Sequence, residues 1–390
     1  MIHRRSKVSI GPIILFICTI ASPVCAAAVA APASAPATRP SLPPAQRVLE
    51  QTLAQPDDYF TSADGIARVQ NIISWQNSNG GWWKTYDPTI PRPPDLPTAD
   101  ELRGGAHDHE SDWRRTSTID NGATCTEMHI LARAQRITDR QADRDAFLKG
   151  LKFLFDAQYP NGGWPQRFPL ESNYGRRITF NDRAMVNVMS LLKEIENGGV
   201  RGADYTFVGE ADRRRCHEAF ERGVDCILNC QIKTHGKLTA WCQQHDEKTF
   251  EPAGARSYEL PSLTAFESSD IVLLLMQREK PTAREGEAIE SAVAWLESCK
   301  IAGKRYDKLT VPSGKVLDRV LVDDPSAPPL WARFYDIDTN KPFFCDRDGV
   351  KRDSIAQVGQ ERRAGYMWYG TWGNNVLAEY PQWKRRVGAK

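Results

Sequence analysis

The sequence has 390 residues, of which 51 are Lys or Arg and 49 are Asp or Glu, so its formal net charge is only +2. This balance argues against a general polyanion-binding surface of the kind that binds nucleic acids, so any recognition of anions must come from local clusters of arginine. The length is sufficient for one large domain or two smaller ones.

The N-terminal residues predict an export signal. Arg4, Arg5 and Lys7 precede an apolar run over residues 8–21, and small residues follow as far as Ala26. This order is typical of a secretory signal peptide, and the apolar run is shorter than the ~20 residues that span a bilayer. We therefore expect a signal peptide over residues 1–26 and a secreted protein, periplasmic or extracellular, with no membrane contact after cleavage.

Residues 27–44 are rich in Ala and Pro and show no hydrophobic period, so they predict a flexible linker. No comparable linker divides residues 45–390, which we expect to form a single, monomeric domain. Seven cysteines follow the predicted signal peptide, and their spacing matches no metal-binding pattern. Export permits disulfides, but the sequence does not define a pairing.

An internal near-repeat predicts the architecture. Helical patterns end at Gln76, Gln158 and Gln231, and a weaker pattern ends near Lys300, at intervals of about 70 to 80 residues. A turn with Gly or Trp follows each of the first three, and a Gly pair suits a helix end that needs a left-handed residue. The four helical patterns cover residues 66–76, 147–158, 216–231 and 289–299.

A second helix is predicted after each turn, beginning near Asp120, Asp182, Pro261 and Ala364. Strand patterns are scarce, with short candidates at residues 305–311 and 316–321. Repeated helix pairs cannot each bury an apolar face alone, so they must close on one another. We expect a predominantly α-helical fold, an incomplete α/α toroid of helical hairpins with long loops and minor short strands. An irregular all-α domain is the alternative.

Polar residues gather at the predicted starts of the second helices. Asp120, Asn121, Asp182 and Arg256 each precede or begin an apolar helix. Any one of the Asp or Asn residues could be an ordinary helix cap. Equivalent positions of a toroid lie on one rim, however, so these side chains are expected to converge. Their oxygen ligands suit a hard cation such as calcium rather than zinc.

Aromatic and arginine residues supply candidates for substrate binding. Tyr258 and Trp164 could stack on sugar rings, although Trp164 closes a helical hairpin and core packing is its alternative role. Arg333 and Arg347 lie among aromatic residues near the C-terminus. Arginines in such positions can hold carboxylates in bidentate fashion, which suggests a substrate with repeated carboxylates. A solvated network of salt bridges is the alternative.

Several motifs in the same order resemble the polysaccharide lyase family 10 pectate lyases, from about residue 64 to residue 383. The motifs cover residues 118–124, 158–166, 180–182, 241–246, 254–259, 333–336 and 362–366. The resemblance implies an α/α toroid and cleavage of α-1,4-linked polygalacturonate (pectate) by calcium-dependent β-elimination, which yields 4,5-unsaturated oligogalacturonides. Residues 45–390 would then be the catalytic domain.

The resemblance also implies roles for individual residues. Asp120, Asn121 and Asp182 look like calcium ligands, and Arg256 looks like the catalytic base. Arg333 and Arg347 look like arginines that bind substrate carboxylates. Arginine is an awkward base because its ordinary pKa exceeds ~12. We therefore expect an alkaline optimum, or else a cationic Arg256 that stabilises the enolate while another group takes the proton.

Two other functions are compatible with the residues themselves. An inverting glycoside hydrolase of α/α-barrel type would use Asp120 and Asp182 as acid and base, at a separation of ~6.5 to 9.5 Å. A non-catalytic pectin-binding protein would keep the toroid but leave the polysaccharide intact. The lyase requires calcium and gives an unsaturated product, whereas a hydrolase gives saturated products and need not require calcium.

Overall fold

The computed structural model describes residues 44–104, 113–198 and 205–388, all of them within one compact unit, Pro36–Lys390. The predicted signal peptide, its cleavage after Ala26 and all of the predicted linker except Pro44 lie outside the described residues. Within those residues, no helix combines the length and the apolar character that crossing a membrane requires.

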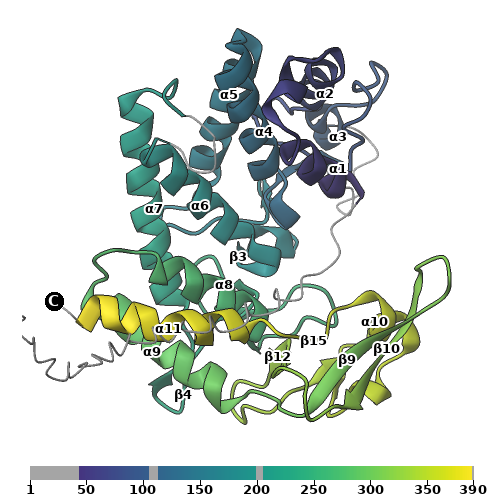
Figure 1. Cartoon of the computed structure of the whole chain (residues 1–390), viewed down its shortest axis with the longest axis vertical. Helices are drawn as coiled ribbons and strands as arrows, with labels where there is room; N and C mark the ends of the chain where they lie inside the picture. Colours follow the sequence, from purple (N-terminus) through teal and green to yellow (C-terminus); the bar gives the residue numbers. More distant parts are fainter. Residues whose placement is uncertain (1–43, 105–112, 199–204, 389–390) are drawn as a thin grey trace, which may run out of the picture. The chain divides into compact units, whose positions relative to one another are not determined.

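Three helical hairpins form the centre of the fold (Figure 1). Each hairpin pairs the second helix of one repeat with the first helix of the following repeat, and the two helices are in contact. In the first hairpin only two residues connect the helices, so they must run antiparallel. The hairpins are α4 (Cys125–Thr138) with α5 (Gln141–Ala157), α6 (Ala184–Glu196) with α7 (Glu210–Cys230), and α8 (Ala265–Met276) with α9 (Ala283–Ser298).

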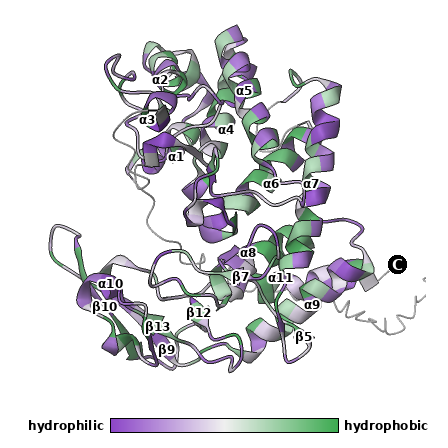
Figure 2. Ribbon diagram, turned by 180° about the vertical axis from the view of Figure 1, so that it is seen from behind, coloured by the Kyte–Doolittle hydropathy of each residue, from purple (hydrophilic) through white to green (hydrophobic). Residues whose placement is uncertain are grey.

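The second helices follow one another through direct contacts. α1 (Pro44–Leu53) contacts α4, α4 contacts α6, α6 contacts α8, and α8 contacts α11 (Gly373–Gly388). α6 and α8 are apolar on most sides, as helices covered by neighbours on several sides must be. Figure 2 shows hydrophobic residues along both, whereas α7 carries long hydrophilic stretches. The predicted incomplete α/α toroid is confirmed.

The turns that end the first helices explain the repeat. The side-chain amide of Gln76 donates to the carbonyl of Gly80 in its own turn and to that of Ala146 on α5, both at 2.8 Å. Gln158 and Gln231 repeat this pattern toward α7 and α9. Each glutamine therefore joins its turn to the next hairpin. The first of these helices, α2, covers Ala63–Ser74.

Glycine is required in these turns for two reasons. Gly80 and Gly162 have φ values of +95° and +88°, which side chains rarely adopt. In addition, a Cβ atom at Gly162 would lie 1.9 Å from the carbonyl oxygen of Arg222 on α7. The turn can approach the neighbouring helix this closely only without a side chain.

One tryptophan after each first helix closes the repeat. The indole N–H of each donates to a backbone carbonyl near the end of the preceding helix at 2.7–2.8 Å. The four are Trp82, Trp164, Trp241 and Trp331. Trp331 extends the repeat to a fourth unit, although β9 (Lys304–Thr310) and β10 (Val316–Asp323) intervene between α9 and this residue.

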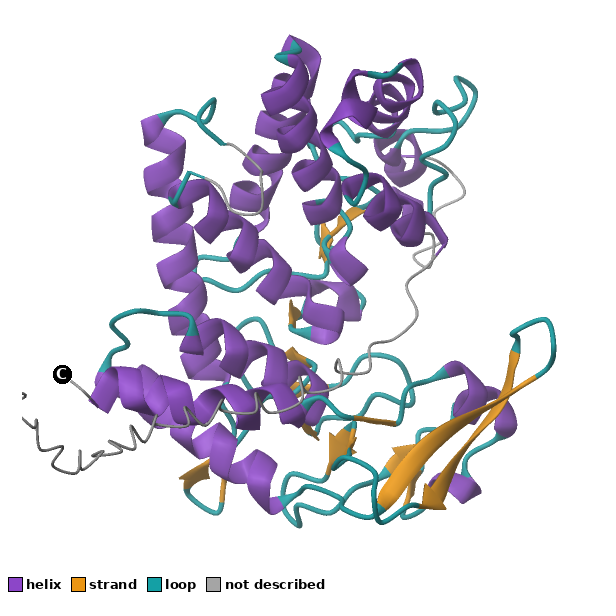
Figure 3. Cartoon of the chain, in the orientation of Figure 1, coloured by secondary structure: helices purple, strands orange, loops and turns teal. Residues whose placement is uncertain are grey.

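Strands are short, as predicted (Figure 3). β9 and β10 form the longest antiparallel pair, with a bulge between Val316 and Asp318. The remaining strands have two residues each and join loops to one another. They are Ser117–Thr118, Arg167–Phe168, Ile178–Thr179, Lys233–Thr234, Lys237–Leu238, Gln244–His245, Pro252–Ala253, Leu263–Thr264, Trp331–Ala332, Phe334–Tyr335, Phe344–Cys345, Lys351–Arg352 and Tyr369–Gly370.

The predicted start of the fourth second helix, near Ala364, is wrong. Ala364 lies near the end of a short helix, α10 (Gln360–Gly365). The helix that packs on α8 and α9 is α11, which begins at Gly373. The apolar residues between the two helices instead form β15 (Tyr369–Gly370), which pairs with β11 (Trp331–Ala332) beside the fourth tryptophan.

Candidate active site

The repeat places four polar side chains at equivalent positions, each two residues after a repeat tryptophan. These residues are Lys84, Gln166, Gln243 and Arg333. The carbonyls of the last three accept backbone hydrogen bonds from the segments that begin the second helices. Ile119 donates to Gln166 at 3.2 Å, Phe180 to Gln243 at 2.8 Å, and Ala265 to Arg333 at 3.2 Å. Each repeat thereby holds the start of a second helix beside the next polar side chain.

Two of these starts are single tight turns that contact each other, Asp120–Gly122 and Asn181–Arg183. Asn121 and Asp182 occupy equivalent left-handed positions, with φ values of 52° and 48°. Asn and Asp tolerate this conformation better than other residues with side chains. Asp120 is therefore equivalent to Asn181, and Asp182 to Asn121. Asp120 and Asp182 thus occupy positions that differ by one residue within their turns, yet both side chains contact the amide of Asn181.

Asp120, Asp182 and Asn181 form what we term the carboxylate centre. The side-chain amide of Asn181 donates to Asp182 Oδ2 at 3.1 Å and approaches Asp120 Oδ1 at 3.4 Å. The two carboxylate side chains are 11% and 17% exposed, so both are largely buried but keep some contact with solvent. The Lys84 ammonium forms an ion pair with Asp120, and the Asn121 side chain also hydrogen-bonds to Asp120.

The two carboxylates differ electrostatically. Burial raises the pKa of Asp120, but the charge and hydrogen bond of Lys84 outweigh it and leave this pKa below its ordinary value. At Asp182, burial raises the pKa and the nearby charges of Asp120 and Glu267 add to the effect, while Arg333 opposes it only in part. Three carboxylates, those of Asp120, Asp182 and Glu267, thus share two cationic partners, Lys84 and Arg333.

A buried layer supports the carboxylate centre. The Arg333 side chain is 2% exposed and donates to Glu267 Oε1 at 2.8 Å, to Asp182 Oδ1 at 3.2 Å and to Asn181 Oδ1 at 3.3 Å. The guanidinium is enclosed among the protein's own acceptors, so this structure does not favour the predicted grip of Arg333 on substrate carboxylates, which stays a prediction. Its role in the described structure is to position Asp182 and Asn181.

Arg256 lies at the other side of the site, on the loop before α8. Its Nε and Nη2 atoms donate to the two carboxylate oxygens of Glu259, at 2.7 and 2.5 Å, and its side chain is 43% exposed. Burial lowers the pKa of Arg256, but the hydrogen bonds and charge of Glu259 outweigh it and hold this pKa well above its ordinary value. The described guanidinium is therefore a cation.

Tyr258 is the support for a cluster of arginines. Its ring is buried, and the guanidinium groups of Arg256, Arg362 and Arg347 lie 4.9, 4.8 and 6.0 Å from its centroid. We call these three residues the arginine cluster. The prediction that Tyr258 stacks on a sugar ring is not supported, because arginines and Tyr366 cover its ring.

Arg347 and Trp164, two further predicted binding residues, differ in exposure. The Arg347 side chain is 63% exposed and pairs with Glu361 at 3.0 Å, so it is accessible to a substrate. Trp164 is fully buried, and its indole donates to the carbonyl of Leu154. Trp164 therefore packs in the core, the alternative role that the sequence suggested, and the structure does not favour its role as a sugar platform.

One hydrogen-bonded path joins the two sides of the site. The Tyr366 hydroxyl donates to Glu259 Oε1 at 2.9 Å and accepts from the Gln243 amide at 3.2 Å. The same amide reaches Asn181 Oδ1 at 3.1 Å. Asp120, Asp182 and Arg256, predicted from separate motifs, therefore belong to one network.

Sequence reasoning missed Lys84, Gln166, Gln243 and Glu267. The first three carry a usable signal, because each lies at the same offset from a repeat tryptophan as Arg333. Glu267 has no such mark. It is an acidic residue inside an apolar helix, α8, and only the burial of Arg333 beside it reveals why it is there.

The carboxylate centre suits a cation held partly by the protein. No group of three or more His, Cys, Asp or Glu side chains suitable for a metal occurs within residues 44–104, 113–198 and 205–388. Asp120 and Asp182 offer hard oxygen ligands, and the Asn121 amide adjoins Asp120. Because the protein supplies few ligands, a cation here would need water or substrate oxygens as further ligands.

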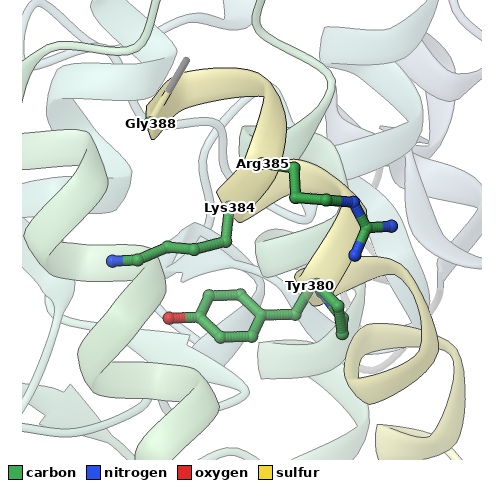
Figure 4. Close-up of a pocket in the computed structure, with 5 residues that line it drawn as sticks. Tyr380, Lys384, Arg385 and Gly388 are labelled. Carbon is green, nitrogen blue, oxygen red and sulfur yellow. The ribbon is translucent and has the colours of Figure 1, made fainter. Parts of the chain in front are cut away.

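A hollow elsewhere contains none of the candidate site residues. It lies along α11 and is lined by Tyr380, Pro381, Lys384, Arg385 and Gly388, with a volume of about 730 Å³ (Figure 4). All five lining residues belong to α11, and the lining has no carboxylate and no link to the network described above. It therefore has no evident part in the chemistry of the site.

Solved structures define the class of protein. A mutant of the family 10 polysaccharide lyase from Cellvibrio cellulosa, in complex with trigalacturonic acid, matches this chain with a TM-score of 0.71 and 32% sequence identity. The match covers 88% of this chain and 97% of that one. A second structure of the family 10 polysaccharide lyase from the same organism gives the same TM-score and identity, and 96% of its chain is covered. The fold is thus that of a polysaccharide lyase.

A family model narrows this class. The model of pectic acid lyases matches residues 76–377, which include every candidate site residue. The chain therefore belongs to the pectic acid lyase family and is a pectate lyase, as the resemblance implied. A comparison with curated proteins found no match.

Proposed function

We propose that this enzyme cleaves α-1,4-linked polygalacturonate by calcium-dependent β-elimination and releases 4,5-unsaturated oligogalacturonides. The observation that carries the proposal is the network itself, in which two partly accessible carboxylates and one accessible guanidinium share a single set of buried supports. The complex of the related lyase with trigalacturonic acid supports a substrate built from galacturonate.

The carboxylate centre is the proposed calcium site. Asp120, Asp182 and Asn121 would hold the ion, with Asn181 and Arg333 fixing the two carboxylates from behind. When bound, calcium would neutralise the C6 carboxylate of the sugar and make the adjacent C5 proton more acidic. The residual negative charge of the centre favours such a cation, and Lys84 is the side chain that must share Asp120 with it.

Arg256 is the proposed group at the reacting carbon. While its two hydrogen bonds to Glu259 remain, the Arg256 guanidinium can donate further hydrogen bonds and carries a positive charge, but it cannot accept a proton. In this state it would stabilise the negative charge that develops at C5 and C6. A role as base requires that the substrate complex break or outweigh the pairing with Glu259. In the elimination itself a base takes the C5 proton, the C4–O bond breaks as the C4=C5 double bond forms, and the leaving oxygen ends as a hydroxyl by taking up a proton, without net consumption of water.

The elimination assay tests the proposal directly. Incubation with polygalacturonate should produce ultraviolet absorbance from an unsaturated product, a chelator should abolish it, and added calcium should restore it. The inverting hydrolase, which the comparisons do not favour, would release saturated products with or without the chelator. Release of no product, with binding retained, would instead indicate a pectin-binding protein.

We also propose that the enzyme is secreted and acts as a monomer. The support for export is the order of basic, apolar and small residues over positions 1–26. Mass spectrometry of the enzyme recovered outside the cytoplasm should show a mature chain that starts at Ala27. Retention of the first 26 residues would contradict the cleavage site, and light scattering would measure the oligomeric state.

A further inference from the structure

A polar groove lies along α9, apart from the active site. It has a volume of about 990 Å³ and runs between the C-terminal end of α7, the hairpin formed by β4 (Lys233–Thr234) and β5 (Lys237–Leu238), and one face of α9. None of Asp120, Asp182, Arg256 or Arg347 lines it. A volume of this size is within the range of sites that enclose a small ligand, about 300 to 1,000 Å³.

The charges along this α9 groove are unequal. Lys233, Lys237 and Arg284 contribute three cations to the lining, and Glu287 contributes the single carboxylate. Among the residues that the structure describes, none forms an ion pair with any of these three cations. Arg284 only donates to the amide oxygen of Asn229, at 2.7 Å. In a chain with a net charge of +2, three cations against one carboxylate in one groove form a local positive site.

The hairpin wall of the groove is fixed on both sides. The Gln231 amide donates to the carbonyls of Thr239 and of Ala288 on α9, both at 3.0 Å. At the hairpin tip, Thr234 and His235 bond to the carbonyls of Ile337 and Asp338 at 3.0 and 2.9 Å. The hairpin is thereby held at a set position over α9, so a ligand would not have to order this wall on binding.

The opposite wall carries groups that suit a sugar. The Trp295 indole donates to Asn340 Oδ1 at 2.7 Å, and both residues line the groove. Ser291 and Ser298 place hydroxyl groups on the same face of α9. Hydroxyls and amides can bond the hydroxyls of a polysaccharide, and the cations can hold its carboxylates.

We propose that the α9 groove is a second, non-catalytic binding site for an anionic oligosaccharide, namely a short segment of the polygalacturonate chain. The proposal rests on the proposed function for the choice of ligand. Such a site would hold the enzyme on a long chain while the active site works elsewhere on it. This attachment would lower KM for long polymers but would not change it for short oligomers.

Hydrogen exchange measured by mass spectrometry tests binding at the groove itself. The probe is a galacturonate hexamer with calcium present, and the protein is the full chain with Arg256→Ala, so that the hexamer is not consumed. We expect slower exchange in peptides covering residues 231–240 and 284–298, as well as near position 256. Adding Lys233→Gln and Lys237→Gln should abolish protection at the groove and preserve it near position 256.

The matched control replaces Lys149 and Lys315, two exposed lysines outside the groove, and it should preserve protection at both places. Absence of protection at the groove, with protection near position 256, would overturn the second site alone. Equal protection by the methyl-esterified, neutral hexamer would overturn its assignment to an anion. Absence of protection anywhere would contradict the proposed substrate as well.

Kinetics of the otherwise unaltered enzyme supply the second readout. Lys233→Gln with Lys237→Gln should leave kcat/KM for trigalacturonate unchanged and raise KM for long polygalacturonate several-fold. The Lys149→Gln and Lys315→Gln control should change neither. Equal effects of the groove variant on the trimer and the polymer would count against a separate site.

Discussion

The carboxylate centre comes from the regular repeats of the toroid, whereas the arginine cluster comes from two loops and the short helix α10. Asp120 and Asn181 occupy equivalent turns, and their supports Gln243 and Arg333 occupy equivalent positions after a tryptophan. Arg256, Arg347 and Arg362 have no such equivalence and meet only around Tyr258. The repeat therefore supplies a rigid, mostly buried half, and the loops supply a more exposed half that can respond to a substrate.

The largest expected effect belongs to the loop half. Arg256→Ala should lower kcat by about 10³-fold, because in the proposed mechanism it removes the guanidinium charge that stabilises the developing enolate. Binding of trigalacturonate to the variant should change much less. Stopped-flow absorbance and calorimetry measure the two quantities. Arg347→Ala is the comparison, because its exposed pair with Glu361 should contribute mainly to KM. Equal losses of kcat in both variants would contradict a special role for Arg256.

A smaller effect is expected in the buried support of the carboxylate centre. Glu267→Gln leaves Arg333 without its nearest anionic partner, so the guanidinium should pull on Asp182 and disturb the cation site. Loss of a supporting residue of this kind typically costs about 10- to 100-fold in metal affinity. Calorimetric titration with calcium, without substrate, measures it. Unchanged affinity would show that the layer serves stability alone.

The pairing of Arg256 with Glu259 can be tested through the pH–rate profile. We expect an alkaline optimum in the native enzyme, and a maximum in the acid range would contradict it. Glu259→Gln removes the group that raises the pKa of Arg256, whereas burial, which lowers this pKa, remains. If Arg256 is the base, the rising limb of kcat/KM should move to lower pH. If it acts as a cation, activity should fall without that movement.

The smallest expected effect is on the free energy of unfolding. Two glycine variants distinguish the cost of a positive φ from the cost of close packing. Gly162→Ala and Gly236→Ala both place a side chain at a positive φ, at a cost of about 1 to 2 kcal/mol. Only Gly162 also faces a neighbouring backbone, since nothing lies within 4 Å of a Cβ at Gly236. Urea unfolding should therefore show a further loss of about 1 to 3 kcal/mol in Gly162→Ala. Equal losses would show that the turn can move away from α7.

Much of the fold follows from local sequence. Apolar spacing, the glutamine and glycine turns and the repeat interval predicted all four first helices and the strands β9 and β10. The same interval brought Asp120 and Asp182 to one rim. The repeat interval gave the wrong start for the fourth second helix. It does not reveal that Ala364 belongs to α10 and that the packed helix starts at Gly373.

By itself, the sequence determined the helical repeat, because the repeat depends on spacing along the chain, and the resemblance of several motifs indicated the family. Together they predicted Asp120, Asp182 and Arg256 as the centre of the site. Only the tertiary structure decided that Arg333, Tyr258 and Trp164 are enclosed. It also decided that Glu267 pairs with Arg333 and that Glu259 pairs with Arg256. The physical reason is that exposure and charge compensation depend on residues far apart in sequence. An arginine beside aromatic residues has the same local pattern whether it faces a substrate or a buried carboxylate.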